Sequence, residues 1–113
     1  MDKIEIKKGD IVVCVLSGDY GKPRPAVVIQ SNSLNKTLAS ILVCPITTYL
    51  INTAIYRLLL TPTELNGLKS QSCIMVDKIN AISIDKIDTK IGKLSFDEII
   101  ELNKALKYCQ DLD

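Results

Sequence analysis

Arg24 is the residue whose surroundings point most directly to chemistry, because it stands between two prolines in the stretch GKPRPAVVI at residues 21–29. Proline fixes its own φ and lacks an N–H, so we expect Pro23 and Pro25 to lie outside a hydrogen-bonded ladder. Pro25 also disfavours the helical region for Arg24 and leaves it extended. A restrained arginine at the start of a strand can bind a phosphate or a carboxylate, and it can equally be an ordinary loop residue.

An acidic residue and two hydroxyl groups could complete a site around this arginine. Asp19 lies five residues before Arg24, and Thr47 and Thr48 end another apolar run. Neighbouring strands would bring these segments to one side of a sheet, where a carboxylate, a guanidinium and a hydroxyl could surround one phosphodiester. Asp19 could also be a turn residue and Thr47 a strand former, so spacing alone leaves both interpretations open.

The composition excludes several kinds of catalyst. The 113 residues include no histidine, which rules out a Ser-His-Asp triad or a histidine acid–base pair within this chain. The four cysteines show no zinc-binding spacing, so we expect no metal and no cofactor. Cys14 and Cys44 lie within apolar runs and are expected to be buried free thiols. The charged start has no apolar signal region and no segment is long enough to span a bilayer, which predicts a cytoplasmic protein without membrane contact.

A nucleic-acid partner would have to bind to a local patch of positive charge, because the net charge of the chain is only +1. Lys22, Arg24 and Lys78 could form a small basic groove. Tyr20 and Tyr49 flank the candidate site in the sequence, and either could stack an unpaired base. Packing at the rim of a barrel explains both tyrosines equally well.

Five short apolar runs predict strands within a single domain spanning residues 1–113. The first, β-branched and uninterrupted, is typical of a strand buried on both faces. Pro45 within the third run argues for an edge strand or a bulge. The sequence from Thr61 to Leu68 predicts a short helical turn that ends at Asn-Gly. The predicted strands cover residues 11–16, 26–30, 41–47, 56–60 and 72–79, the last continuing or kinking through 81–84.

The last segment predicts one amphipathic helix. Ser95 and Glu98 form a capping-box pattern at its start, and the helix is expected to run to about Leu112. Strands followed by a terminal helix favour a small, strongly bent sheet or barrel with the helix packed on it. The apolar positions that recur at spacings of three and four, and that we expect to be buried, are Phe96, Ile99, Ile100, Leu102, Leu106 and Cys109.

Several motifs, in order, resemble the MazF/PemK toxins of bacterial toxin–antitoxin systems. They are G-D-I-V, R-P-A-V-V-I, V-C-P-I-T-T, N-G-L-K-S-Q-S-C-I-M-V-D-K-I and I-G-K-L-S-F-D-E, and together they cover nearly the whole chain. The resemblance implies a mainly β fold, a small SH3-like β-barrel of the CcdB/PemK type with a C-terminal α-helix. It also implies a homodimer and a cognate antitoxin protein as partner.

The same resemblance implies a sequence-selective, metal-independent endoribonuclease that cleaves single-stranded RNA. The ribose 2′-OH would attack, leaving a 2′,3′-cyclic phosphate and a 5′-OH. The family's catalytic positions fall on Arg24, Thr47, Asp19 and Asp77, with Thr48 as a neighbour of Thr47. The chain departs from the family around Asp77, where Lys78 follows in place of the usual Gln. Two alternatives stay open: a catalytically decayed RNA-binding member, and a gyrase poison like CcdB, although the chain lacks the CcdB tail.

Overall fold

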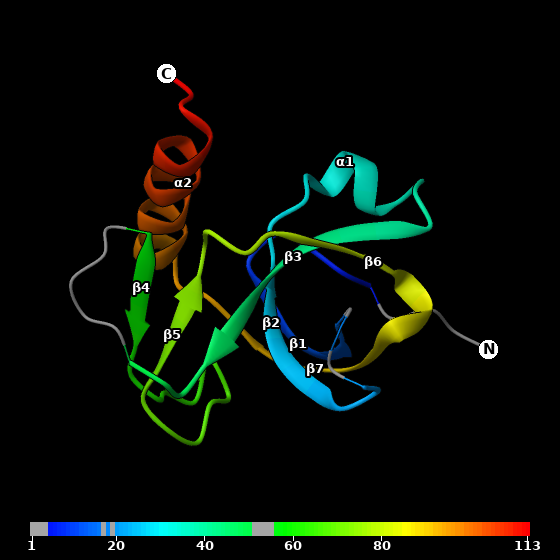
Figure 1. The fold of residues 1–113 in the computed structure, drawn as a ribbon, viewed down its shortest axis with the longest axis horizontal. Coiled ribbons are helices and arrows are strands. Elements are labelled where there is room, and N and C mark those ends of the chain that lie inside the picture. The colour runs from blue at the N-terminus through cyan, green and yellow to red at the C-terminus, as the bar shows by residue number, and fades with distance from the viewer. Residues whose placement is uncertain (1–4, 17, 19, 51–55) are drawn as a thin grey trace.

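The computed structural model describes residues 5–16, 18, 20–50 and 56–113. They form a seven-stranded antiparallel sheet, a C-terminal helix, one short helix and one 3₁₀ turn (Figure 1). The strand order is β4-β5-β3-β2-β1-β7, and β6 pairs with β3 off this path. This mainly β architecture with a terminal helix confirms the predicted fold class. The elements are β1 (Asp10–Val15), β2 (Pro23–Val28), α1 (Asn32–Asn35), β3 (Ser40–Thr47), β4 (Arg57–Leu60), β5 (Ser72–Met75), β6 (Asn80–Ser83), η1 (Ile84–Lys86), β7 (Ile87–Lys93) and α2 (Phe96–Gln110).

Most residues of the central strands β1, β2 and β3 are buried, and they lie on both faces of the sheet because successive side chains of a strand point to opposite sides. One face packs against α2, and the other lines the curled half of the sheet, on the right of Figure 1. This arrangement confirms the doubly buried strand predicted for the first apolar run. The helix-side core includes Ile11, Val27, Cys44, Ile46, Leu60, Ile74, Leu102 and Leu106, and the barrel-side core includes Ile6, Val12, Cys14, Leu16, Ala26, Val28, Ile41, Val43 and Ile82.

Helix α2 begins with the predicted capping box. The Glu98 amide donates to Ser95 Oγ at 3.2 Å, and the Ser95 amide donates to Glu98 Oε1 at 2.8 Å. The helix ends at Gln110, slightly before the expected end, with Asp111 as a left-handed C-cap. Its buried residues are Leu102, Ala105 and Leu106.

Part of the predicted apolar stripe on α2 is exposed, and that prediction was wrong. Phe96 is 78% exposed and Ile100 38% exposed, and Cys109 is also exposed. At about 100° per residue, Phe96 and Ile100 lie roughly 120° and 160° around the helix from Leu102. Spacings of three and four residues therefore included Phe96 and Ile100, which point away from the face of α2 that packs on the sheet.

Pro45 does not mark an edge strand, which was the first of the two alternatives predicted for it, since β3 has partners on both sides. On one side β3 pairs with β2, with Ala26 opposite Pro45. On the other side it pairs with β6 as far as Val43 and with β5 from Ile46 onward. Cys44 and Pro45 lie between these two ladders. A residue without an N–H is tolerated at this place because no ladder hydrogen bond is required there.

Strand β7 was not predicted, and it pairs with β1 through an irregular register. Most of its side chains are at least partly exposed, so it lacks the apolar alternation that signals a strand. The predicted fifth strand is in fact two strands, β5 and β6, separated by a turn after Met75. Both pair with β3, at different places along it.

The predicted turn at residues 61–68 is present and is organised by Asn66, which is 1% exposed. Its Oδ1 accepts hydrogen bonds from the amides of Thr63 and Leu68, each at 3.0 Å. The Gly67 amide donates to the Thr63 carbonyl at 3.1 Å, which closes one helical turn. Gly67 has a φ of +68°, and a Cβ there would lie 2.1 Å from the carbonyl oxygen of Ile91. Only glycine fits this position without distortion.

Candidate active site

Arg24 and Thr47 lie at the same end of the curled half of the sheet, on neighbouring strands. The β2–β3 pairing runs from Val28 and Val43 to Ala26 and Pro45, so Arg24 and Thr47 each lie two residues beyond its described end. Both residues line a pocket of about 340 Å³, together with Leu16, Pro25, Pro45, Ile46, Thr48 and Met75.

The two prolines beside Arg24 lie inside a ladder, and the prediction that they would lie outside one was wrong. Pro23 and Pro25 belong to β2 and are opposite Val15 and Val13 of β1. Val28 of β2 accepts a hydrogen bond from the Gly9 amide, so the even-numbered residues of β2 face the β1 side. The prolines therefore face the β3 side, where described pairing starts only at Ala26. Arg24 is thus fixed in an extended strand, as expected.

Thr47 and the two residues after it form the opposite wall. Thr47 is half-buried, and its Oγ1 accepts a hydrogen bond from the Tyr49 amide at 3.1 Å. The Cys73 thiol donates to the Tyr49 carbonyl at 3.7 Å. Thr48 is exposed, and the Tyr49 side chain is 74% exposed. The hydroxyl hydrogen of Thr47 remains able to donate, because the oxygen serves here as acceptor.

The segment before β2 carries the other predicted RNA contacts. Tyr20 is fully exposed and has a φ of 53°, a left-handed conformation that is unfavourable for a side-chain-bearing residue. Lys22 is exposed two residues later. Asp19, the predicted acidic partner of Arg24, lies outside the described residues.

Asp77 is held by a residue that the sequence analysis did not single out. Arg57 Nε lies 2.9 Å from Asp77 Oδ1, and Arg57 Nη2 donates to Oδ2 at 3.1 Å. The Nε–H itself is not directed at an acceptor. Asp77 is absent from the described residues that line the Arg24–Thr47 pocket. Lys78, next in the chain, is exposed.

A signal for Arg57 exists in the sequence, where a single cation opens the apolar run RLLL. In the register of β4 and β5, Arg57 lies opposite Met75, and Met75 lines the pocket. The Arg57–Asp77 pair is therefore next to the pocket wall. The guanidinium carbon also lies 6.0 Å from the centre of the Tyr56 ring, at the outer limit for a cation–π contact.

The cysteines offer no nucleophile to this site. Cys14, Cys44 and Cys73 are buried and outside any disulfide, as predicted for the first two, and Cys109 is exposed. Burial raises the pKa of the Cys44 thiol to about 12, with smaller contributions from Cys109 and Asp77. Burial also raises the pKa of Cys109, helped by the charge of Asp77. Thiolates are scarce at neutral pH under these conditions. Among the described residues no group of three or more His, Cys, Asp or Glu side chains could hold a metal ion.

Comparison with known proteins defines the family and the fold of this chain. Residues 7–109 match the family of PemK-like, MazF-like toxins of type II toxin–antitoxin systems. A probable endoribonuclease MazF from Mycolicibacterium smegmatis is 31% identical over 102 residues, which cover 89% of this chain and 93% of that protein. The chain therefore belongs to the MazF/PemK family of endoribonuclease toxins.

Solved structures support the same fold. The Mycobacterium tuberculosis toxin MazF-mt6 superposes with a TM-score of 0.80 at 24% identity, covering 92% of this chain and 98% of that chain. A mycobacterial endoribonuclease in complex with its cognate antitoxin superposes with a TM-score of 0.82 at 18% identity, covering 96% and 97%. In the part of the chain that the structure describes, no helix is both long and apolar enough to cross a membrane.

Proposed function

We propose that this protein is a sequence-selective endoribonuclease toxin that cleaves single-stranded RNA without a metal ion. The observation that carries the proposal is that Arg24 on β2 and Thr47 on β3 line one pocket. A guanidinium and a hydroxyl in the same pocket suit one phosphodiester and its neighbouring ribose.

The proposed reaction uses the RNA's own 2′-OH. Its oxygen attacks the adjacent phosphorus, the bond from phosphorus to the 5′ oxygen breaks, and that oxygen takes up a proton. The products are a 2′,3′-cyclic phosphate and a 5′-OH. Arg24 would bind the non-bridging oxygens through its planar fork and stabilise the charge that develops on them. Arginine stays protonated throughout, so we assign it an electrostatic role.

The remaining roles concern protons and orientation. Asp19 is our first candidate for the base that accepts the 2′-OH proton, and Thr47 would orient the phosphate or the 2′-OH. Asp77 is the second candidate base. Its contacts with Arg57 favour a positioning role, because both carboxylate oxygens are within 3.1 Å of guanidinium nitrogens.

The RNA would be bound by exposed side chains around this pocket. Tyr20 and Tyr49 are exposed and lie in the segments just before Arg24 and just after Thr48, and each could stack a base for about 1–3 kcal/mol. Lys22 would contact backbone phosphates, and Thr48 would line the path of the strand. Lys78, beyond Asp77, is assigned a phosphate contact further along the RNA.

The partners follow from the family. We propose that a cognate antitoxin protein inhibits this chain, as a mycobacterial endoribonuclease and a Deinococcus radiodurans MazF of similar fold have been crystallised with such partners. We also propose that the chain acts as a homodimer in the cytoplasm. No cofactor is required by the proposed reaction.

A cleavage assay tests this function. The purified chain is incubated in EDTA with a long unstructured RNA, and every new 5′ end is mapped. Discrete cuts with 5′-OH ends are expected, and Arg24→Ala should lower their rate by about 10²- to 10³-fold. Lys104→Ala, a change of an exposed cation on α2, is the matched control. Full activity in Arg24→Ala, or dependence on Mg²⁺, would contradict the proposal.

A further inference from the structure

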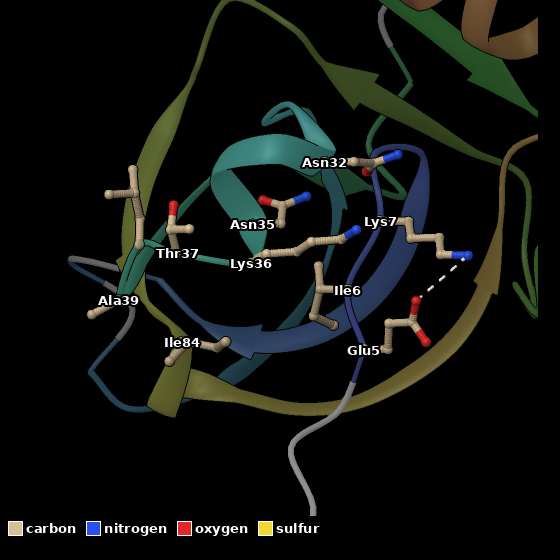
Figure 2. A pocket seen from close by; sticks show the side chains of 10 residues that line it. Glu5, Ile6, Lys7, Asn32, Asn35, Lys36, Thr37, Ala39 and Ile84 are labelled. Atoms are coloured by element: carbon tan, nitrogen blue, oxygen red, sulfur yellow. Dashed lines mark ion pairs between the residues drawn. The ribbon is translucent and has the colours of Figure 1, made fainter.

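A second and larger pocket lies at the other end of the curled half of the sheet. It has a volume of about 640 Å³, within the range typical of ligand sites. It is lined by the segment before β1, by α1 and the residues after it, and by Ile84 after β6 (Figure 2). These segments adjoin the start of β1 and the end of β2, whereas Arg24 lies at the start of β2. Six residues of strand, about 17–20 Å, separate the two ends.

The walls of this pocket are tied together by contacts between distant parts of the chain. Gln30 and Asn35, both buried, exchange hydrogen bonds: Gln30 Nε2 donates to Asn35 Oδ1 at 3.0 Å, and Asn35 Nδ2 donates to the Gln30 carbonyl at 3.1 Å. The Lys8 amide donates to Asn32 Oδ1 at 2.7 Å, which joins the N-terminal segment to α1. The Ile84 amide donates to the Ala39 carbonyl at 2.8 Å. The pocket is therefore preformed.

The lining combines an apolar floor with positive charge. Ile6 is part of the barrel-side core, Ile84 packs against that core, and Leu38 is 44% exposed. Lys36 has no ion-pair partner among the described residues. Within the described part of the chain Lys7 forms an ion pair only with Glu5, at 3.6 Å, and both side chains of that pair are more than half exposed. Such an exposed ion pair contributes little to stability, so a carboxylate of a ligand can replace Glu5 beside Lys7.

The chemistry of the lining favours a peptide over RNA. Neither an aromatic residue nor an arginine is among the described residues that line the pocket. These residues offer no platform on which a base could stack and no planar fork for a phosphate. Two lysines in the same pocket as apolar side chains suit a ligand that carries a carboxylate next to a leucine-like side chain. Asn32 and Thr37 add polar groups that could meet a peptide backbone.

We propose that this pocket binds an acidic, apolar peptide segment of a protein partner, at a site separate from the RNA-cleaving centre. Carboxylates of the segment pair with Lys36 and Lys7, and an apolar side chain between them packs on Ile6, Leu38 and Ile84. The proposal does not depend on the nuclease assignment, because none of these residues lines the Arg24–Thr47 pocket.

The test uses the whole chain and a synthetic probe, an acetylated and amidated octapeptide that alternates aspartate with leucine. Binding is measured by calorimetry, and its place by methyl NMR of the isoleucines. We expect shifts at Ile6 and Ile84 and none at Ile46 or Ile74. Lys36→Glu should weaken binding at least about tenfold, as expected for a lost charge-assisted contact. Lys104→Glu, which changes the net charge equally on α2, should leave the affinity unchanged.

Each other outcome overturns the proposal. Equal weakening by Lys36→Glu and Lys104→Glu would mean non-specific charge attraction, and unchanged binding in Lys36→Glu would mean another site. Tight binding of a lysine–leucine octapeptide would remove the charge argument. Shifts of Ile6 and Ile84 by a short RNA, with none by the peptide, would assign the pocket to nucleic acid. RNA cleavage by Lys36→Glu should equal that of the parent chain, which keeps this test separate from that of the active site.

Discussion

Arg57 of β4 and Asp77 of the turn after β5 form an ion pair, with two nitrogen–oxygen distances of 2.9 and 3.1 Å. The Arg57 side chain is only 9% exposed, and that of Asp77 is 31% exposed. A largely buried guanidinium needs its carboxylate, because an unpaired buried charge is costly. The pair therefore stabilises the corner of the sheet beside Met75, which lines the candidate active site.

Removing one member of this pair should destabilise the protein. We expect Arg57→Met to lower the free energy of unfolding by about 1–3 kcal/mol, less than for a fully buried pair because Asp77 is partly exposed. Urea denaturation measures this. Glu101→Gln, which breaks the exposed Lys104–Glu101 pair at 3.3 Å, is the control and should change stability by less than about 0.5 kcal/mol. Equal effects of the two variants would show that the Arg57–Asp77 contact is no stronger than a surface pair.

Thr47 should matter to catalysis through its hydroxyl. Thr47→Val keeps the side-chain shape but loses the oxygen that accepts from the Tyr49 amide. We expect the cleavage rate to fall by roughly 10- to 100-fold, in keeping with the loss of an orienting polar group. Thr47→Ser, which keeps the hydroxyl, should stay within a few-fold of the parent chain. A Thr47→Val chain that cleaves normally would leave Thr47 with a structural role only.

Two glycines with positive φ should respond differently to alanine. At Gly67 the new Cβ meets the backbone of Ile91, while at Gly18 a Cβ would have nothing within 4 Å. Both substitutions cost about 1–2 kcal/mol for a left-handed alanine. Gly67→Ala should cost at least about 2 kcal/mol more, because a backbone carbonyl cannot easily move. Thermal melting of the two variants compares these costs, and similar melting temperatures would contradict the close approach.

Cys44 should make the protein less stable at high pH. Its pKa is raised to about 12 in the folded chain, above the ordinary value of 9.0. Between these values the unfolded chain loses the thiol proton while the folded chain retains it, so the free energy of unfolding falls as pH rises. The full contribution is present below about pH 9, and the slope above it is about 1.4 kcal/mol per pH unit. Cys44→Ala should flatten the slope measured by urea denaturation between pH 9 and 10.5, whereas an unchanged slope would mean that other groups cause it.

The sequence predicted features whose signals are local. The capping box at Ser95 needs only residues three apart, and the doubly buried first strand shows in its unbroken apolar run. The strand β7 and the Arg57–Asp77 pair depend on contacts made far along the chain. No local pattern shows that a mostly polar segment completes a sheet or that Arg57 lies opposite Met75.

The candidate site was predicted in part for the same reason. Arg24 lies just before one apolar run and Thr47 ends another. Neighbouring antiparallel strands bring such positions to the same end of a sheet, and here both residues line one pocket. The place of the prolines was misjudged because the sequence does not show which edge of a strand each N–H faces. Apolar residues that line the pocket, such as Leu16 and Met75, have no side-chain chemistry that marks them in the sequence. Only the folded structure shows that they belong to the site.

Alternate residues of β1, β2 and β3 belong to different cores, as with Val27 and Val28 or Val43 and Cys44. Because β1, β2 and β3 contribute residues to both cores, loss of packing in one core disturbs strands that also form the other. The two halves of the molecule should therefore melt in a single cooperative transition, although each has a core of its own. A toxin built in this way would present its RNA site fully assembled or not at all.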